Sequence, residues 1–592
     1  DFNDYEMGQR HDLEVINIIT KEAQLNDNVP EKYRGMDRFE ARKAVVADME
    51  AEGCLIKIDD HPHNVAHAER DDTILEPFLT DQWFVKTESL AKKCLAAADN
   101  GDINFVPGRH EKVYRHWLNN IQDWCISRQL WWGHRIPAWY DKDGNIKVQA
   151  ESPGEGWEQD KDILDTWFSS ALWPFSTLGW PEKTPELEKY YPQVAIMPGV
   201  DILFFWVIRM MMMGLEFMEQ PPFKTIYLHA LVLDAHGQKM SKSKGNVMDP
   251  LELIEKYGTD ALRYTLAAQA APGQDIRLSD DRVENGRNFC TKLWNVARYA
   301  EMNEVVFDAD FDPATATHPV NRWIVSELHD VITHVDKAFE DFRFNDVAQS
   351  LYSFSWNTFC DWYLELTKPL VYGDDEEVKA ETRATFGWVL EKMLKLLHPT
   401  MPFITEEIWQ NLTQNQAGES IMLASWPMAS ECPVDSAARD DINWLVSVVG
   451  AIRNVRVENK VPHKEKIAAY VRSQSSDDQK RLEKFSTYFE TLANITAFKP
   501  MDGSPGQTDL VAVAEGFEVI LPLEGIVDFE AEKERIQKEI AKFEAELNKI
   551  EGMLGNPSFV EKAPDHVVNA QQARKDEILA DLGKLKDVLH AR

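Results

Sequence analysis

The sequence has few cysteines, and none of them form a C-x-x-C pair. The six cysteines stand far apart along 592 residues, which excludes a zinc ribbon and a disulfide framework and indicates reduced thiols. Three neighbouring histidines, His61, His63 and His67, are not joined by a cysteine or carboxylate that completes a persuasive ligand set. We therefore predict no metal site built from the protein's own side chains.

Long hydrophobic runs are also missing. The most apolar stretch, residues 202–218, is interrupted by Arg209 and Glu216 and is both too short and too charged to cross a bilayer. No signal peptide opens the chain. We expect a cytoplasmic protein that does not bind membranes.

Positive charge is scarce. The chain has 64 Lys and Arg against 99 Asp and Glu, a formal net charge of −35, which argues against a protein that binds polyanions generically. A local basic surface can still bind a nucleic acid, because clustered lysines and arginines create a positive electrostatic potential there even when the net charge is negative. The length predicts several domains, about three to five.

One basic loop stands out in this acidic chain. It reads Lys239-Met240-Ser241-Lys242-Ser243, it follows an apolar run of strand length at 226–233, and a helix is predicted to begin at Asp249-Pro250. Such a loop can bind a polyphosphate. Its lysine ammoniums, hydroxyls and backbone N–H groups can stabilise the negative charge of the phosphates during a reaction. For an arbitrary K-x-S-K-S sequence, a solvated basic turn is the alternative.

Several stretches resemble one enzyme family. The basic loop matches the KMSKS loop of class I aminoacyl-tRNA synthetases letter for letter, and residues 124–134 resemble the W-x-I-S-R-Q-x-x-W-G-H segment of the isoleucyl, leucyl and valyl enzymes. On periodicity alone, that second segment would be a buried element with two Trp in its core. Residues 359–363 and 398–409 resemble the helical anticodon-binding domain, and residues 556–564 resemble the arm tip of bacterial valyl-tRNA synthetases. The chain thus resembles the valyl-tRNA synthetase family over nearly its whole length.

The C-terminal stretch has its own periodic signal. Apolar residues alternate spacings of four and three on both sides of Gly555-Asn556-Pro557. They are Ile536, Ile540, Phe543, Leu547, Ile550 and Leu554 before the break and Ile578, Leu582, Leu585 and Leu589 after it. Two seams joined by such a break predict an antiparallel coiled-coil hairpin within one chain, with a dimerising coiled coil as the alternative.

The resemblance implies an α/β and α fold. We expect the second half of a class I nucleotide-binding (Rossmann) catalytic domain with a remnant of an editing domain, a helical-bundle anticodon-binding domain, a small α/β junction and the coiled coil. The predicted boundaries are 1–75 for the editing remnant, 76–240 for the catalytic half, 241–312 for the loop exit and helical connection, 313–435 for the anticodon-binding domain, 436–525 for the junction and 526–592 for the arm.

The first segment also carries local predictions. Residues 15–19 have the composition of a strand, residues 37–53 that of an amphipathic helix, and the acidic start that of a turn. The start resembles the editing domain of the valyl enzymes, where a carboxylate at the position of Asp4 holds the α-ammonium of a wrongly attached amino acid. The resemblance also places Asp1 at this editing site, with less support than Asp4.

Further site residues follow from the resemblance. The expected ATP-binding residues are Lys239, Met240, Ser241, Lys242, Ser243, Gly199, Asp201 and His229, with Lys239 and Lys242 as catalytic lysines. Trp167 and Ile202 are expected to wall the valine side chain, since a rigid wall admits a small branched substrate and crowds out a longer one.

The function implied is the ATP-dependent ligation of valine to tRNA(Val) through valyl-adenylate, with Mg²⁺ accompanying ATP and with hydrolysis of mischarged threonyl-tRNA. We expect a monomer. The family's N-terminal portion with its H-x-G-H motif is not in this sequence, so we expect a fragment that is inactive alone. A non-catalytic tRNA-binding protein derived from a synthetase is one alternative. An isoleucyl enzyme is another, disfavoured because its C-terminal cysteine-rich zinc module is absent.

Overall fold

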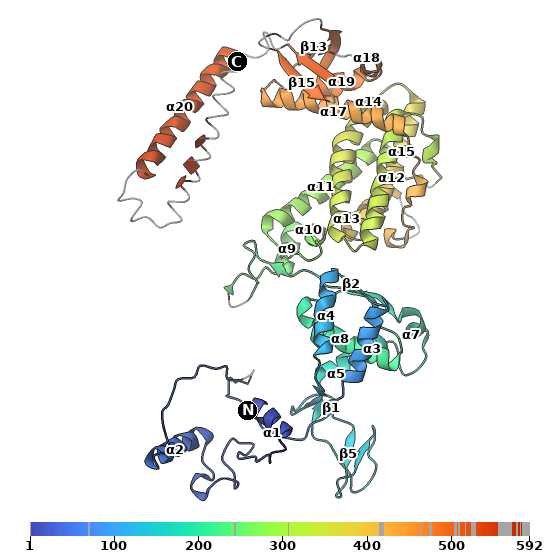
Figure 1. Cartoon of the computed structure of the whole chain (residues 1–592). Coiled ribbons are helices and arrows are strands. Elements are labelled where there is room, and N and C mark those ends of the chain that lie inside the picture. The colour runs from blue at the N-terminus through green and yellow to red at the C-terminus, as the bar shows by residue number, and fades with distance from the viewer. Residues whose placement is uncertain are drawn as a thin grey trace. The chain divides into compact units, whose positions relative to one another are not determined.

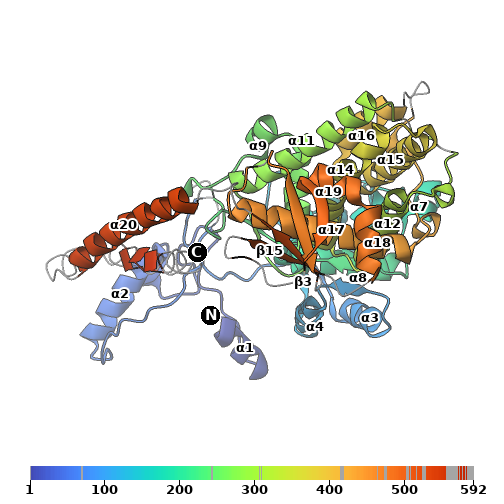
Figure 2. The same ribbon diagram turned by 90° about the horizontal axis from the view of Figure 1, so that it is seen from above.

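The structure is a computed structural model that divides into two compact units, Asp1–Ile226 and Tyr227–Arg592, described separately below (Figures 1 and 2). The described residues are 2–68, 71–241, 244–305, 307, 308, 310–413, 419–462, 464–472, 476–501, 506, 509–514, 517–522 and 529–554, together with 571, 572, 574, 575, 578, 579 and 582.

The first part of the chain is mostly irregular. It contains α1 (Phe2–Arg10), the short helix η1 (Glu31–Tyr33) and α2 (Arg38–Ala51). Asp37 caps α2 by accepting a hydrogen bond from the Phe39 amide, which confirms the helix predicted at 37–53. The acidic start is a helix, not a turn. The strand predicted at 15–19 is wrong: among the described residues only the isolated bridge between Ile19 and Leu25 forms there, and without a partner ladder an apolar run does not become a strand.

The rest of the first unit is an α/β core. Its elements are β1 (Phe84–Val85), α3 (Glu88–Asp99), β2 (Asn104–Val106), η2 (Gly108–His110), α4 (Glu111–Asn119), β3 (Trp124–Cys125), β4 (Ser127–Arg128), β5 (Ala138–Tyr140), β6 (Ile146–Val148), β7 (Glu158–Gln159), β8 (Ile163–Leu164), α5 (Thr166–Ser170), α6 (Trp173–Ser176), α7 (Pro185–Tyr190), β9 (Gln193–Ile196), η3 (Val200–Ile202), η4 (Leu203–Val207), α8 (Ile208–Phe217) and β10 (Phe223–Tyr227).

Three strands lie in the order β2-β10-β9, and β9 and β10 run parallel with Phe223 opposite Gln193. Four consecutive methionines of α8, residues 210–213, are buried. Of the three tryptophans in residues 124–134, Trp124 is buried but Trp131 and Trp132 are fully exposed, so the prediction of two core tryptophans is wrong. The apolar run predicted as one strand at 226–233 is instead the end of β10 and a separate short strand, β11 (Val232–Leu233).

The second unit continues with helices. They are α9 (Pro250–Tyr257), α10 (Thr259–Gln269), α11 (Asp280–Met302), η6 (Pro313–Thr315), α12 (Pro319–Glu340), α13 (Phe344–Tyr352), η7 (Ser353–Tyr363), α14 (Leu364–Val371), α15 (Glu376–Leu397), α16 (Pro402–Thr413), η8 (Ile421–Leu423) and η9 (Ala429–Glu431), with the short strand β12 (Ile276–Arg277) between α10 and α11. Asp249 caps α9, as the Asp-Pro signal predicted.

The bundle core follows the predicted periodicity. On α12, Ile324, Leu328, Val335 and Ala338 are buried in one large hydrophobic cluster, and Val331 packs at its edge. At the start of this bundle, α10 is tied to α16. The Asp260 carboxylate of α10 accepts the Ile404 amide at 2.6 Å and the Phe403 amide at 3.3 Å, and Arg263 donates to two carbonyls just before α16. A carboxylate at a helix N-terminus satisfies amides that have no partner inside the helix.

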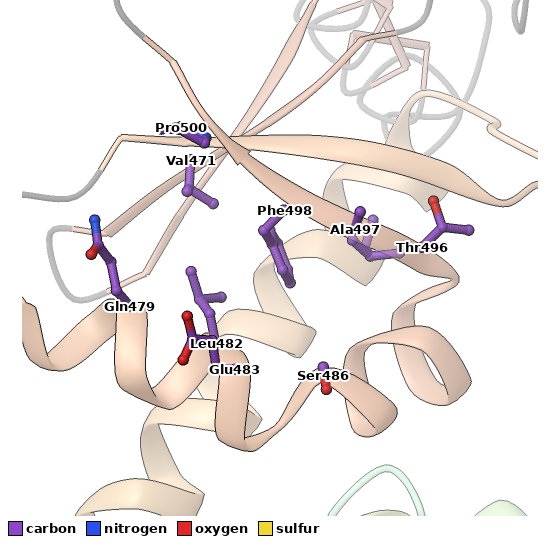
Figure 3. A pocket seen from close by; sticks show the side chains of 10 residues that line it. Val471, Gln479, Leu482, Glu483, Ser486, Thr496, Ala497, Phe498 and Pro500 are labelled. Carbon is purple, nitrogen blue, oxygen red and sulfur yellow. The ribbon is translucent and has the colours of Figure 1, made fainter.

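A small α/β segment follows the bundle, as predicted. It consists of α17 (Ser436–Glu458), β13 (Ile467–Arg472), α18 (Ser476–Lys484), α19 (Ser486–Ala493), β14 (Ile495–Pro500), β15 (Leu510–Ala514) and β16 (Phe517–Leu521), with strand order β14-β13-β16-β15. A cavity of about 400 Å³ lies between β14 and the helices α18 and α19, and Figure 3 shows Phe498 and Leu482 pointing into it from opposite sides.

The C-terminal segment contains the helix α20 (Phe529–Leu554). Its Ile540 and Ile550 form a buried cluster with Ile578 and Leu582, so two predicted seams meet. Two ion pairs join the same segments, Arg574 with Glu546 at 3.1 Å and Lys575 with Glu551 at 2.9 Å. Leu585 and Leu589 of the predicted seam lie outside the described residues.

Candidate functional site

The basic loop leaves β11, which pairs in parallel with β12, and returns toward α9. Two polar side chains brace it. Asp234 accepts hydrogen bonds from the backbone amides of Gln238 at 2.8 Å and His236 at 3.0 Å. Asn246 donates to the other Asp234 oxygen at 2.9 Å and accepts from the Ser241 amide at 3.0 Å. The two ends of the loop are therefore held together through one carboxylate and one amide.

This bracing affects the titration of Asp234. The amide of Gln238 and the side chain of Asn246 both donate to its carboxylate, and they lower its pKa below the ordinary aspartate value. The charged form is the one that accepts these bonds, so the loop is braced at neutral pH. The sequence motif did not point to Asp234 or Asn246. The Asp-x-x-Gly turn and the Gly-Asn that closes the loop were the available signals.

The five motif residues take different positions in the loop. Lys239 is exposed, and Met240 packs against the cluster of Leu253 and Tyr257 from α9. Ser241 is half-buried, and its backbone oxygen accepts from the Lys244 amide at 3.2 Å. Lys242 and Ser243 lie outside the described residues. Met240 thus anchors the loop on a helix while Lys239 faces solvent.

Of the three other expected residues, Gly199 and His229 follow the ends of parallel strands. Gly199 comes after β9, is buried, and begins the turn that leads into η3, where Asp201 is exposed. His229 comes after β10, is exposed, and its Nδ1 lies 2.9 Å from the Ala230 carbonyl oxygen. In open α/β sheets, ligands bind outside the carboxyl ends of the strands, which is where both residues stand in the chain.

The two expected pocket residues belong to the first unit. Trp167 of α5 is half-buried and stacks on Phe205, with ring centroids 6.0 Å apart and planes at 25°. Ile202 is half-buried at the end of η3, three residues before Phe205. Trp167 and Ile202 thus belong to one unit, while Lys239, Ser241 and His229 belong to the other.

A buried carboxylate beside Trp167 was missed by sequence reasoning. Asp165 accepts from the Trp167 amide at 3.3 Å with one oxygen and from the Trp124 indole at 2.9 Å with the other. The second oxygen also meets Arg128 at 3.0 Å and Arg209 at 3.4 Å. Arg209 in turn lies 3.9 Å from the centroid of the Trp124 ring. These residues come from three places in the sequence, so no local spacing could have joined them.

The expected editing residues belong to the first segment of the chain. Asp4 is exposed on α1, and Asp1 lies outside the described residues. Among the described residues, no group of three or more His, Cys, Asp or Glu side chains is placed to hold a metal ion. The described helices also include none with the length and hydrophobicity needed to cross a membrane.

Three family models match the chain. The model described as tRNA synthetases class I (I, L, M and V) matches residues 5–279, which include the loop and the turn after β9. The anticodon-binding domain of tRNA ligase matches residues 321–471, and the valyl tRNA synthetase tRNA binding arm matches residues 528–591. The α/β fold with a helical bundle is therefore a class I synthetase catalytic fold followed by an anticodon-binding domain.

Similar proteins include three bacterial valine–tRNA ligases. The protein of Caulobacter vibrioides is 48% identical over 100% of this chain and 66% of its own length, that of Nitrobacter winogradskyi 42% over 100% and 69%, and that of Bacillus subtilis 44% over 98% and 66%. The chain thus spans about two thirds of the length of these relatives. Among solved structures, a methionyl-tRNA synthetase of Mycobacterium tuberculosis in complex with methionyl-adenylate is 20% identical over 60% of this chain and 69% of its own, with a TM-score of 0.46. On the sequence matches, the chain belongs to the valyl-tRNA synthetase family of class I aminoacyl-tRNA synthetases.

Proposed function

We propose that this chain acts in the ATP-dependent ligation of valine to tRNA(Val), with valyl-adenylate as the intermediate. The observation that carries the proposal is the braced loop, which presents Lys239 on a fixed base in a chain related to valine–tRNA ligases. Lysine ammoniums in such a loop can meet the charge that develops on the phosphates as the amino acid attacks. Lys242 takes the second lysine role, and Ser241 and Ser243 supply hydroxyls.

The remaining residues receive roles on the same basis. The turn from Gly199 to Asp201 lies against the ribose of ATP, and His229 lies beside the nucleotide. Trp167 and Ile202 wall the valine side chain, and the stack of Trp167 on Phe205 supports this role because it holds the indole rigid. ATP brings Mg²⁺, whose oxygen ligands are then largely phosphates and water.

The proposal extends to editing and to organisation. Asp4, with Asp1, belongs to a site that hydrolyses threonyl-tRNA. Editing is needed because threonine is nearly isosteric with valine. Valyl-tRNA synthetase is the standard example of an apolar pocket that rejects threonine only weakly. We assign the segments as 1–75 editing, 76–240 catalytic, 241–312 connecting, 313–435 anticodon-binding, 436–525 junction and 526–592 arm, and the protein as a cytoplasmic monomer.

The test is valine-dependent exchange between ATP and pyrophosphate. The chain is assayed alone and after mixing with the part of a bacterial valine–tRNA ligase that has no counterpart in it, using valine, isoleucine and threonine in turn. We expect exchange on mixing, with valine strongly preferred, and none from the chain alone. Preference for isoleucine would refute the substrate. Retained binding of tRNA(Val) without any exchange in the mixture would favour a tRNA-binding protein that has lost catalysis.

A further inference from the structure

A cavity of about 480 Å³ lies between α4 and the η4–α8 helix of the first unit. Phe204, Ile208 and Met212 line it from one helix, four residues apart and therefore on one face. Ile202 belongs to η3, which comes before this helix. Neither Ile202 nor Trp167 lines this cavity, which is thus distinct from the proposed valine pocket.

Two arginines line the cavity and share one buried carboxylate. The side chains of Arg209 and Arg128 are 15% and 38% exposed, and the Asp165 side chain behind them is 6% exposed. Arg128 donates to Asp165 and to two backbone carbonyls. Among the described residues, the one hydrogen bond from the Arg209 guanidinium goes to Asp165 and is long, 3.4 Å. Asp165 is therefore shared by two cations.

Arg209 still has donors to satisfy. A guanidinium carries five N–H groups, and burial lowers the pKa of Arg209 because the charged form loses water; Asp165 partly opposes this effect and Arg128 adds to it. One face of the guanidinium is covered by the Trp124 ring. An anion in the cavity would accept the remaining hydrogen bonds in the fork geometry that suits phosphate.

Part of the lining is aromatic. Trp117 of α4 stacks on Phe204 with ring centroids 4.4 Å apart and planes at 24°. Despite this stack, Trp117 is 43% exposed, so much of the indole is open to a ligand. Asn120 and Gln122 add side-chain amides, and Asp123 adds a carboxylate that accepts from the Thr87 amide. Amides and a carboxylate can pair with the edge of a base, whereas the arginines hold its phosphate.

We propose that this cavity binds a nucleotide, with its phosphate on Arg209 and Arg128 and its base against the wall of Trp117 and Phe204. Its volume falls within the range of about 300–1,000 Å³ typical of small-ligand sites. Two sources share this chemistry, a free mononucleotide and the end of a single-stranded RNA. The inference does not rest on the proposed function, because no residue of the basic loop takes part.

The test measures binding of AMP and CMP to the full chain by titration calorimetry, with inorganic phosphate as competitor. We expect Trp117→Leu and Arg209→Lys each to weaken nucleotide binding at least tenfold. The matched controls are Trp173→Leu, an exposed tryptophan outside the cavity, and Arg115→Lys, an arginine of α4 paired with Asp99 and Glu111. Both controls should leave the dissociation constant within twofold. Lys239→Ala should also leave it unchanged, which separates this site from the proposed ATP site.

Several results would overturn the proposal. Absence of saturable binding, or binding that Trp117→Leu and Arg209→Lys leave unchanged, would refute the site. If inorganic phosphate binds as tightly as AMP, the proposed contact between the base and the aromatic wall is wrong. Circular dichroism checks the fold of Arg209→Lys, and Trp117→Leu alters an exposed side chain, so it carries the test if the arginine variant unfolds. A pentanucleotide RNA that binds at least tenfold more tightly than AMP would identify RNA as the source, and equal or weaker binding would identify the free nucleotide.

Discussion

At the scale of single residues, carboxylates hold several parts of this molecule in place. Asp234 closes the basic loop, Asp165 gathers two arginines and an indole, and Glu381 accepts from Asn321 and from the Thr317 and His318 amides at the start of α12. The sequence motif led directly to the lysines of the loop but not to these acids. Some of their hydrogen-bond partners lie tens of residues away in the chain. A sequence pattern does not predict which distant donors will contact one carboxylate.

The first prediction concerns the second lysine of the loop. In the mixture that supports exchange, Lys242→Ala should lower the rate of valyl-adenylate formation by about 10²–10³, because one donor to transition-state charge is removed. Valine binding should change little, since the ammonium acts mainly as the phosphates react. ATP–pyrophosphate exchange at saturating valine measures the rate. Lys244→Ala, an exposed lysine two residues on, is the control, and a Lys242→Ala rate within threefold of the parent would contradict the assignment.

The second prediction concerns pH. His318 is half-buried at the start of α12, and its Nδ1 accepts the Val320 amide at 3.3 Å. Burial lowers the pKa of His318 from its ordinary value of 6.5; the nearby Glu381 opposes this and Lys484 adds to it. As the pH falls, His318 therefore takes up a proton in the unfolded chain before it does so in the folded one. The stability that neutral His318 gives to the folded chain is complete above pH about 6.5, and it is lost as the pH falls through the pKa of His318 in the folded chain.

His318→Asn keeps a capping acceptor that does not titrate. The urea midpoint of the helical bundle, followed from pH 7.5 to 5.0, should fall more steeply for the parent than for His318→Asn. Parallel curves for the two proteins would show that His318 does not contribute to the pH dependence of stability.

At the scale of elements, helices were predicted better than strands. The helices at α2, α9 and α12 carry their signals locally, in a capping Asp or His and in apolar residues three and four apart. A strand needs a partner from elsewhere in the chain, so an apolar run alone is ambiguous. Residues 15–19 have such a run without a ladder among the described residues, and residues 226–233 divide into β10 and β11.

The third prediction concerns the element that holds the loop. Asn246→Ala removes the acceptor of the Ser241 amide and the donor to Asp234. A hydrogen bond contributes about 1 kcal/mol, so exchange of the Ser241 amide should speed up by roughly fivefold. Hydrogen exchange by mass spectrometry on peptides covering 238–241 gives the rate. The Leu251 amide, capped by Asp249 at 2.9 Å, is the internal control, and equal rates in both proteins would show that Asn246 does not brace the loop.

At the scale of the whole chain, the contrast is between a net charge of −35 and a segment matched by the tRNA binding arm model. The cations of this segment whose side chains the structure describes include two groups. Arg574 and Lys575 are paired with glutamates of α20, whereas Lys538, Lys542 and Lys549 are exposed along that helix. Composition alone predicted the acidic balance but not this division, because pairing depends on how the two seams meet.

The fourth prediction uses that division. Replacing Lys538, Lys542 and Lys549 together by alanine should weaken binding of tRNA(Val) and reduce the slope of log K against log salt by about 2–3, roughly one for each phosphate that no longer meets a lysine. Deleting residues 526–592 should reduce it further and leave exchange in the mixture nearly unchanged. The charge-matched control replaces Lys43, Lys92 and Lys480, exposed lysines on other helices. An unchanged slope in the triple variant would place the phosphate-binding residues elsewhere, and a dimer that becomes a monomer on deletion would identify the arm as a dimerisation element.

The bond between α10 and α16 gives the second unit a mechanical property. Asp260 and Arg263 fasten α10 to the start of α16, while Ala261 and Leu262 of the same helix pack in the cluster that holds Met240. One short helix is thus clamped to the anticodon-binding segment on one side and to the base of the basic loop on the other. We therefore expect a displacement of α16 to be passed through α10 to the residues that hold Met240, and so to change the position of the basic loop.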